Sequence, residues 1–187
     1  AYKRFGVSTC VAALFLIPVL FERIDVRPEI FSFFFFSLFL VILFHNREKP
    51  TRLVLFLPIL IILWVNLHIY FFMGIVLLSL FVVDGFLSKR RNIWCTYNKI
   101  LLLTLSLSAV AALLNPHTLQ GALYPLSAFK NYGYTIEENQ TIFLLESLGF
   151  HKVSVDFFKI AVFLLFSILL LRFKKTKPID WLLAFGF

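Results

Sequence analysis

The sequence has few residues of the kinds that build disulfide frameworks, metal centres or phosphate loops. Among 187 residues there are two cysteines, four histidines and seven glycines. Cys10 lies in an apolar run and Cys95 in a basic segment, which predicts two free thiols. The sequence contains no glycine-rich phosphate loop, no Cys/His metal-ligand spacing and no nucleophile motif. These absences exclude the protein classes that such motifs define.

What the chain has in abundance is apolar sequence. It is 60% hydrophobic, has a mean hydropathy of +0.91 and contains 25 phenylalanines. Soluble domains contain roughly 45–50% apolar residues and interrupt their apolar runs. Here apolar runs of fifteen or more residues alternate with short charged segments, which is typical of a polytopic helical membrane protein. Such runs must be helical, because backbone polar groups in lipid need internal hydrogen-bond partners.

The predicted fold class is therefore an all-α integral membrane bundle with six full spans and a truncated seventh. The chain begins at Ala1 and ends within an apolar segment, so we expect residues 1–187 to be a single transmembrane domain from a longer protein. Several predicted spans have only about fifteen residues, which is short for a crossing. The seven predicted segments are residues 5–21, 30–44, 53–65, 69–87, 100–114, 157–171 and 179 onward.

The charges divide the connecting segments into two sets. Four segments, "YKR", "HNREKPTR", "SKRRNIWCTYNK" and "RFKKTKP", hold two, three, four and four Lys or Arg residues, thirteen of the eighteen in the chain. Seven of the ten acidic residues fall in the other set. The positive-inside rule places the basic set in the cytoplasm and loops 22–29, 64–70 and 115–156 outside. The predicted location is the bacterial inner membrane, with the bilayer as partner and no nucleic acid.

The apolar stretch from Leu53 to Leu87 must cross twice, because basic segments flank it on both sides. A continuous helix of this length would extend about 52 Å, well beyond a bilayer core of about 30 Å. We therefore predict a helical hairpin whose turn is "WVNLH", residues 64–68. Trp64 and Tyr70 are expected to be interfacial aromatics beside this turn.

Polar residues collect in the predicted outer loops. In "ERIDVRPE", Pro28 and Glu29 suit a helix start, while Arg27 suits a phosphate and a carboxylate such as Asp25 suits a base or metal ligand. The plainer interpretation is a solvated loop with a helix cap. Asp84, at the inner end of a span, is expected to pair with Lys89 or Arg90.

The turn supplies Asn66 and His68, which a tight turn can direct into one cavity. His68 suits phosphate binding or acid–base chemistry, because its pKa lies near neutral pH. The alternative is that Asn66 caps the next helix and His68 is an interfacial side chain. Asn115 and His117 follow the fifth predicted span, where Asn-Pro also serves as a helix stop. The long loop 115–156 is expected to contain interfacial helices such as 141–149.

The Phe-rich span after Arg27-Pro28, then "LPILIILWVNLHIYFFMG", then a span ending in Leu-Asn-Pro, resembles bacterial GT-C-type membrane glycosyltransferases. The likeness covers residues 30–125, and Trp64-x-Asn66-x-His68 with Gly74 is its most distinctive part. The resemblance implies an all-helical enzyme that moves a sugar from a polyprenyl-phosphate carrier to a lipid, glycan or protein acceptor on the outer face. Its base is typically an Asp in the first outer loop, which in this chain precedes residue 1 or corresponds to Asp25.

On this hypothesis Asp25, Glu29 and His68 are the catalytic candidates. Arg27, Asn66, Asn115 and His117 bind the lipid-linked phosphate or orient the site. The sequence names no cofactor, and a divalent metal held by Asp25 or Glu29 is the one candidate. Two alternatives stay open: a transporter, flippase or glycan-polymerase-type protein for lipid-linked substrates, and a non-catalytic membrane subunit.

Overall fold

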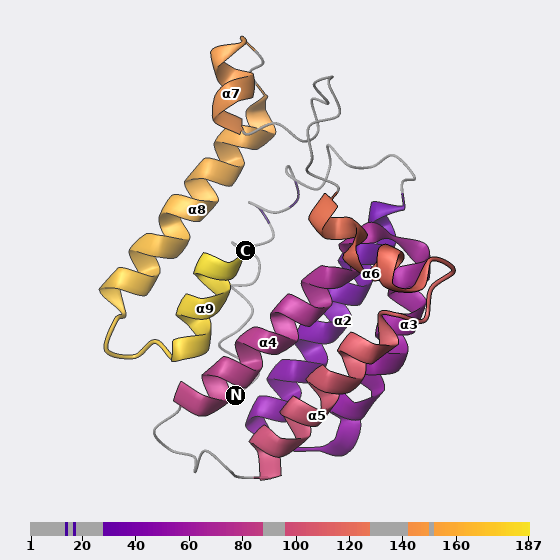
Figure 1. Ribbon diagram of the computed structural model, residues 1–187. Coiled ribbons are helices and arrows are strands. Elements are labelled where there is room, and N and C mark those ends of the chain that lie inside the picture. Colours follow the sequence, from indigo (N-terminus) through magenta and orange to yellow (C-terminus); the bar gives the residue numbers. More distant parts are fainter. Residues whose placement is uncertain (1–13, 15–16, 18–27, 88–95, 128–141, 150–151) are drawn as a thin grey trace. The chain divides into compact units, whose positions relative to one another are not determined.

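The computed structural model describes residues 14, 17, 28–87, 96–127, 142–149 and 152–187. Within these ranges every regular element is helical and there is no strand, as the sequence predicts (Figure 1). Asp25, Arg27, Lys89 and Arg90 lie outside the described residues, as does most of the predicted span 5–21. The elements are α2 (Glu29–Glu48), η2 (Arg52–Phe56), α3 (Leu57–Leu67), η3 (Ile69–Phe71), α4 (Phe72–Leu87), α5 (Thr96–Ala111), α6 (Thr118–Ser127), α7 (Ile142–Ser147), α8 (Val153–Leu171) and α9 (Pro178–Gly186).

The chain divides into two compact units. The larger unit comprises residues 27–129 and 176–187 and contains helices α2 to α6 and α9. The smaller unit comprises residues 1–26 and 130–175 and contains α7 and α8. Within the smaller unit, Lys159 of α8 pairs with Glu146 of α7, so the short helix predicted near residues 141–149 is tied to the long one.

The first helix of the larger unit begins where proline chemistry predicts. Pro28 is the N-cap of α2, and Glu29 places a carboxylate in the first turn, where the helix dipole favours negative charge. The helix then continues to Glu48, four residues beyond the predicted end of the span at Phe44. The charged segment "HNRE" is therefore the last turn of the helix and not a loop.

The long apolar stretch 53–87 breaks at His68. The backbone of His68 is extended, with φ −156° and ψ 145°, between the end of α3 and the start of η3. A Cβ built on Gly74 of α4 would lie 2.8 Å from Trp64 and 3.2 Å from Ile61 of α3. Residues before and after the break therefore approach each other near the turn, while α3 and α4 each pack mainly against α2 and α5. The predicted turn 64–68 is wrong for residues 64–67, which form the last turn of α3, and only His68 is extended.

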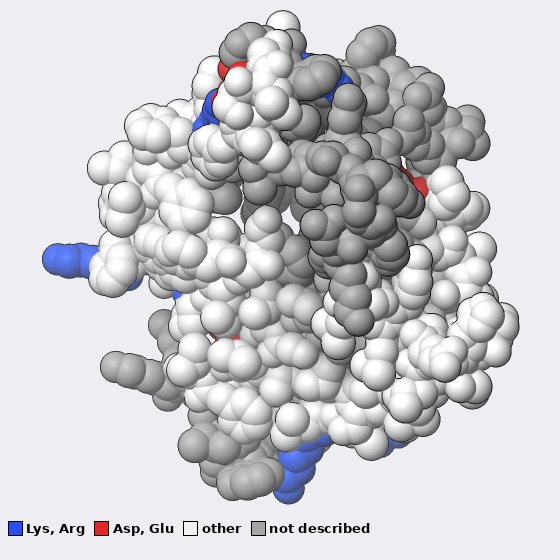
Figure 2. Space-filling model, turned by 45° about the horizontal axis from the view of Figure 1, so that its top comes forward, with Lys and Arg blue, Asp and Glu red and all other residues white. Residues whose placement is uncertain are grey.

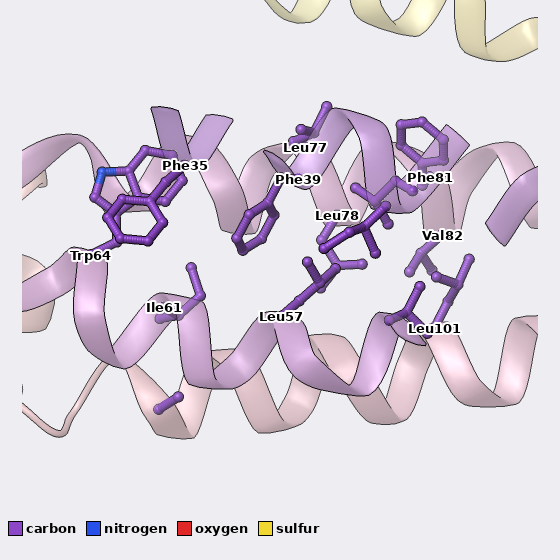
Figure 3. Packing of buried hydrophobic residues seen from close by; sticks show 14 of the residues in the cluster. Phe35, Phe39, Leu57, Ile61, Trp64, Leu77, Leu78, Phe81, Val82 and Leu101 are labelled. Carbon is purple, nitrogen blue, oxygen red and sulfur yellow. The ribbon is translucent and has the colours of Figure 1, made fainter. Parts of the chain in front are cut away.

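The core of the larger unit lies where α2, α3, α4 and α5 meet. Figure 3 shows Phe35 and Phe39 of α2 beside Trp64 and Ile61 of α3. The Trp64 ring stacks on Phe35 at 5.5 Å and meets Phe39 edge-on at 5.7 Å. Trp64 is 0% exposed, so the expectation of an interfacial aromatic is wrong for this residue. Its indole is a core side chain because Phe35 and Phe39 of α2 and Gly74 of α4 pack against it, whereas Tyr70 remains exposed.

Three helices are long and apolar enough to cross a membrane: Glu29–Glu48, Ile69–Leu87 and Val153–Leu171, with 20, 19 and 19 residues. Two further apolar helices, Arg52–Leu67 and Thr96–Ala111, are shorter. In the described part of the chain this is fewer than the six full spans predicted. On the face drawn in Figure 2, most described atoms belong to residues other than Lys, Arg, Asp and Glu, as expected of a chain this apolar.

Candidate functional site

A pocket of about 630 Å³ lies beside the break between α3 and α4. Two segments nearly fifty residues apart form it: residues 65–71 around the break, and residues 115–124 at the start of α6. Figure 1 shows α6 next to the end of α3. The lining residues are Val65, Asn66, Leu67, His68, Ile69, Phe71, Asn115, Pro116, His117, Gln120, Gly121 and Tyr124.

His68 is held by a hydrogen-bonded chain that begins in the core. Trp64 Nε1 donates to Ser32 Oγ at 2.9 Å, and Ser32 Oγ lies 2.7 Å from His68 Nδ1. Ser32 is a buried residue of α2, 4% exposed. The two hydrogen bonds therefore connect α2 to the break at His68. Tyr70 adds an edge-to-face contact with the imidazole at 4.7 Å. The ring orientation of His68 is therefore determined on two sides.

Ser32 is a site residue that the sequence analysis missed. Its only sequence signal is a small hydroxyl inside a phenylalanine-rich run, and such a residue usually bonds to its own helix backbone.

The environment of His68 favours the neutral imidazole. Burial lowers the pKa of His68 below its ordinary value of 6.5, and the negative charge of Glu29 opposes this in part. Glu29 is half-buried in the first turn of α2. Two of the predicted catalytic residues, Glu29 and His68, are thus electrostatically coupled at one end of the larger unit.

Asn66 joins the hairpin to the end of α5. Its Nδ2 donates to Ile62 O at 2.7 Å and to Leu114 O at 2.9 Å. The side chain therefore does not cap the following helix, which was the alternative interpretation. Because both donors of the amide are used, the Oδ1 atom is the group that Asn66 can offer to a pocket ligand.

Asn115 shapes the second wall of the pocket. Its Nδ2 donates to Ala112 O and Thr118 O, both at 2.8 Å, and its Oδ1 accepts from His117 N at 2.8 Å. A Cβ on Gly121 would collide with the Asn115 side chain, so α6 lies directly against this turn. The amide of Asn115 thus holds the backbone that carries His117, whose side chain is exposed.

The structure brings together four of the seven predicted site residues. One pocket is lined by Asn66, His68, Asn115 and His117. The charge of Glu29 acts to raise the pKa of His68 in that pocket, against the larger effect of burial. Gln120 and Tyr124 also line it and were not predicted; their one-turn spacing on α6 is the signal that could have identified them. Asp25 and Arg27, the remaining two, fall in the undescribed segment just before α2.

The pocket combines apolar walls with a few hydrogen-bonding groups at one end of the bundle. The described residues that line it include no Lys, Arg, Asp or Glu. Among the residues that the structure describes, no cluster of three or more His, Cys, Asp or Glu side chains could hold a metal ion. The imidazoles of His68 and His117 and the amide of Gln120 can donate to an uncharged or anionic polar group attached to an apolar body, and Asn66 Oδ1 can accept from a hydroxyl.

Comparison with protein-family models, with curated protein sequences and with solved structures finds no match to this chain.

Proposed function

We propose that the chain is part of a polytopic bacterial inner-membrane glycosyltransferase of the GT-C kind. It would transfer a sugar from a polyprenyl-phosphate donor to a lipid, glycan or protein acceptor on the outer face. The observation that carries the proposal is the convergence of Asn66, His68 and His117 from distant segments on one largely apolar pocket. A polyprenyl phosphate has the matching chemistry, because its chain is apolar and its headgroup accepts hydrogen bonds.

Within this proposal the groups divide by their chemistry. His68 and His117 donate hydrogen bonds to phosphate oxygens, as neutral or charged imidazoles both can. The Oδ1 atom of Asn66 accepts from a sugar hydroxyl. Glu29, which is close enough to influence the pKa of His68, is the described candidate for the base that deprotonates the acceptor. Asp25 and Arg27 are assigned as base and phosphate ligand from the sequence alone.

The binding step is tested with the full-length protein in proteoliposomes and a diazirine-bearing polyprenyl phosphate. Photolabelling is expected within peptides 65–71 and 115–124, with competition by unlabelled polyprenyl phosphate and not by the polyprenol that lacks phosphate. His68→Leu and His117→Leu should each weaken labelling about tenfold, because leucine has no hydrogen-bond donor for the charged phosphate. Equal competition by polyprenol would show a merely apolar groove and contradict the proposal.

His45→Leu is the matched control for this experiment. His45 is an exposed histidine of α2 that lies sixteen residues beyond Glu29, or about 24 Å along the helix. Its replacement should leave labelling unchanged.

Transfer is measured with the same proteins and radiolabelled polyprenyl-phosphate sugars from a native membrane extract. Glu29→Gln or His68→Leu should abolish incorporation into the acceptor fraction without loss of protein. Binding without any transfer by the unmodified protein would instead favour a transporter or flippase. Neither binding nor transfer would favour a non-catalytic subunit.

A further inference from the structure

We infer that Ser32 is a positioning residue that fixes His68 as a neutral hydrogen-bond donor, with the imidazole proton on Nε2. The inference rests on the proposed function only for the identity of the ligand. It narrows the role of His68, for which the residue type alone allows either proton donation or proton abstraction.

The direction of the hydrogen-bonded chain follows from the donor inventory. An indole N–H can only donate, so Ser32 Oγ accepts from Trp64 Nε1 at 2.9 Å. A serine hydroxyl then still has one hydrogen to donate. Among the described residues, the acceptor that this hydrogen reaches is His68 Nδ1, at 2.7 Å.

Burial makes this arrangement specific. Ser32 is 4% exposed and Trp64 is 0% exposed, so water cannot readily supply an alternative partner to either group. If His68 Nδ1 carried the proton, Ser32 would accept two hydrogen bonds and leave its own hydrogen buried without an acceptor, which is costly. With Nδ1 accepting, the proton of the neutral ring must be on Nε2.

The surroundings of His68 agree with a neutral ring near pH 7. Burial of the imidazole lowers its pKa despite the nearby Glu29 carboxylate. His68 lines the pocket, while its Nδ1 atom is engaged by Ser32 at the α2 side. Nε2–H is then the polar group that His68 has left for a ligand, and a phosphate oxygen is an acceptor that it can serve.

The tautomer is tested by two-bond ¹H–¹⁵N correlation spectra of the whole chain, labelled with [¹⁵N]histidine, in micelles at pH 7.5. The His68 signals are assigned by their loss in His68→Gln. We expect the Nδ1 resonance of an unprotonated, hydrogen-bonded nitrogen and the Nε2 resonance of a protonated one. A protonated Nδ1 would overturn the inference.

The role of Ser32 is tested by Ser32→Ala. This variant should move the His68 Nδ1 resonance toward that of an unprotonated nitrogen that accepts no hydrogen bond. It should also shift the resonance of the Trp64 indole proton. The conservative variant Ser32→Thr should retain both signals. Ser108→Ala is the matched control, because Ser108 is an equally buried helical serine whose Oγ has no hydrogen-bond partner among the described groups. An unchanged Nδ1 resonance in Ser32→Ala would overturn the assignment.

The same variants separate this inference from the proposed function. Ser32→Ala should weaken photolabelling by the diazirine-bearing polyprenyl phosphate about three- to tenfold, whereas Ser32→Thr and Ser108→Ala should not. If the NMR result holds and no variant affects labelling, Ser32 still fixes the tautomer and the phosphate-lipid ligand is wrong. If labelling depends on His68 but Nδ1 is protonated, the ligand stands and the positioning role is wrong.

Discussion

Arg47 and Asp84 form a two-point ion pair that joins α2 to α4. Arg47 Nε lies 2.7 Å from one carboxylate oxygen of Asp84 and Nη2 lies 3.2 Å from the other. The second oxygen also accepts from Ile179 N at 3.0 Å, so the same carboxylate joins the start of α9 to the bundle. The sequence predicts Lys89 or Arg90 as partners, and both lie outside the described residues. Among the described residues the last turn of α2 supplies the cation, because that helix continues past the predicted end of its apolar run.

Asp84→Asn should destabilise the larger unit by about 3 kcal/mol, because it removes the charge of the carboxylate that two guanidinium nitrogens contact, where both side chains are shielded. The side chains of Arg47 and Asp84 are only 15% and 3% exposed. Equilibrium unfolding in mixed micelles measures the effect. Glu146→Gln is the comparison: the pair that it breaks with Lys159 has side chains 23% and 40% exposed and should contribute about 1 kcal/mol or less. An equal loss of unfolding free energy in the two variants would contradict the claim that burial strengthens the effect of the Arg47–Asp84 pair.

Gly74→Ala should reduce the free energy of unfolding by about 1–3 kcal/mol, the usual cost of adding a methyl group to a packed core. The new methyl would lie 2.8 Å from Trp64, 3.1 Å from Phe39 and 3.2 Å from Ile61, three fully buried side chains. Gly186→Ala serves as control, because the nearest atom that its new methyl would meet is a flexible methyl group of Leu80. An unchanged free energy of unfolding in Gly74→Ala would show that the side chains around Gly74 can move to admit the methyl group without loss of stability.

Thr118→Gly should stabilise the protein by up to about 1 kcal/mol, although glycine is normally unfavourable at a helix start of this kind. Thr118 has φ 47°, a left-handed conformation that β-branched residues rarely adopt. Thr96→Gly is the matched control, since Thr96 is also an exposed first residue of a helix. Thermal unfolding of both variants should show opposite signs. Destabilisation by Thr118→Gly would mean that side-chain contacts of Thr118 outweigh the backbone strain.

The stability of the larger unit should decrease as the pH falls below about 6.5, in part through His68. Because burial lowers the pKa of His68 from 6.5 in the folded protein, the unfolded chain binds this proton more readily. The contribution to stability is therefore fully present above the unfolded pKa and is lost as the pH falls toward the lower folded pKa. Unfolding measured at pH 7.5 and 5.5 should show a smaller difference in His68→Gln than in the unmodified protein. An identical difference would remove His68 as the cause.

Cysteine labelling tests the proposed orientation. In a Cys-free background, single cysteines replacing Asn66, Lys49 or Arg90 are expected to react with a membrane-impermeant maleimide from outside only at position 66. The expectation follows from the positive-inside rule, since positions 49 and 90 lie in basic segments. External labelling at 49 or 90 in intact cells would invert the orientation.

Much of the local structure follows from short-range features of the sequence. Pro28 and Glu29 mark the start of α2, and the polar "NLH" within an apolar stretch marks the break at His68. Run length predicts helices, because backbone groups in an apolar environment must bond within their own segment. Run length does not predict where helix α2 ends, since charged residues of its last turn can find partners on a neighbouring helix.

The candidate site was predictable only in part, because contacts between different helices also decide which side chains reach the pocket. Residue chemistry identifies His68 and His117, which have few other uses beside apolar runs. It does not identify Ser32, because the value of a buried hydroxyl depends on what packs against it. Ser32 is 36 residues from His68 in the chain, and only the packing of α2 against the hairpin places its Oγ at 2.7 Å.

By itself, then, the sequence determined an all-helical chain of apolar segments with a break within "WVNLH", since helix formation and helix breaking depend on near neighbours. The tertiary structure decided that Trp64 is buried, that Arg47 pairs with Asp84 and that residues 65–71 and 115–124 form one pocket. These outcomes depend on which helix faces are in contact, and apolar runs this uniform leave the choice of faces to long-range packing.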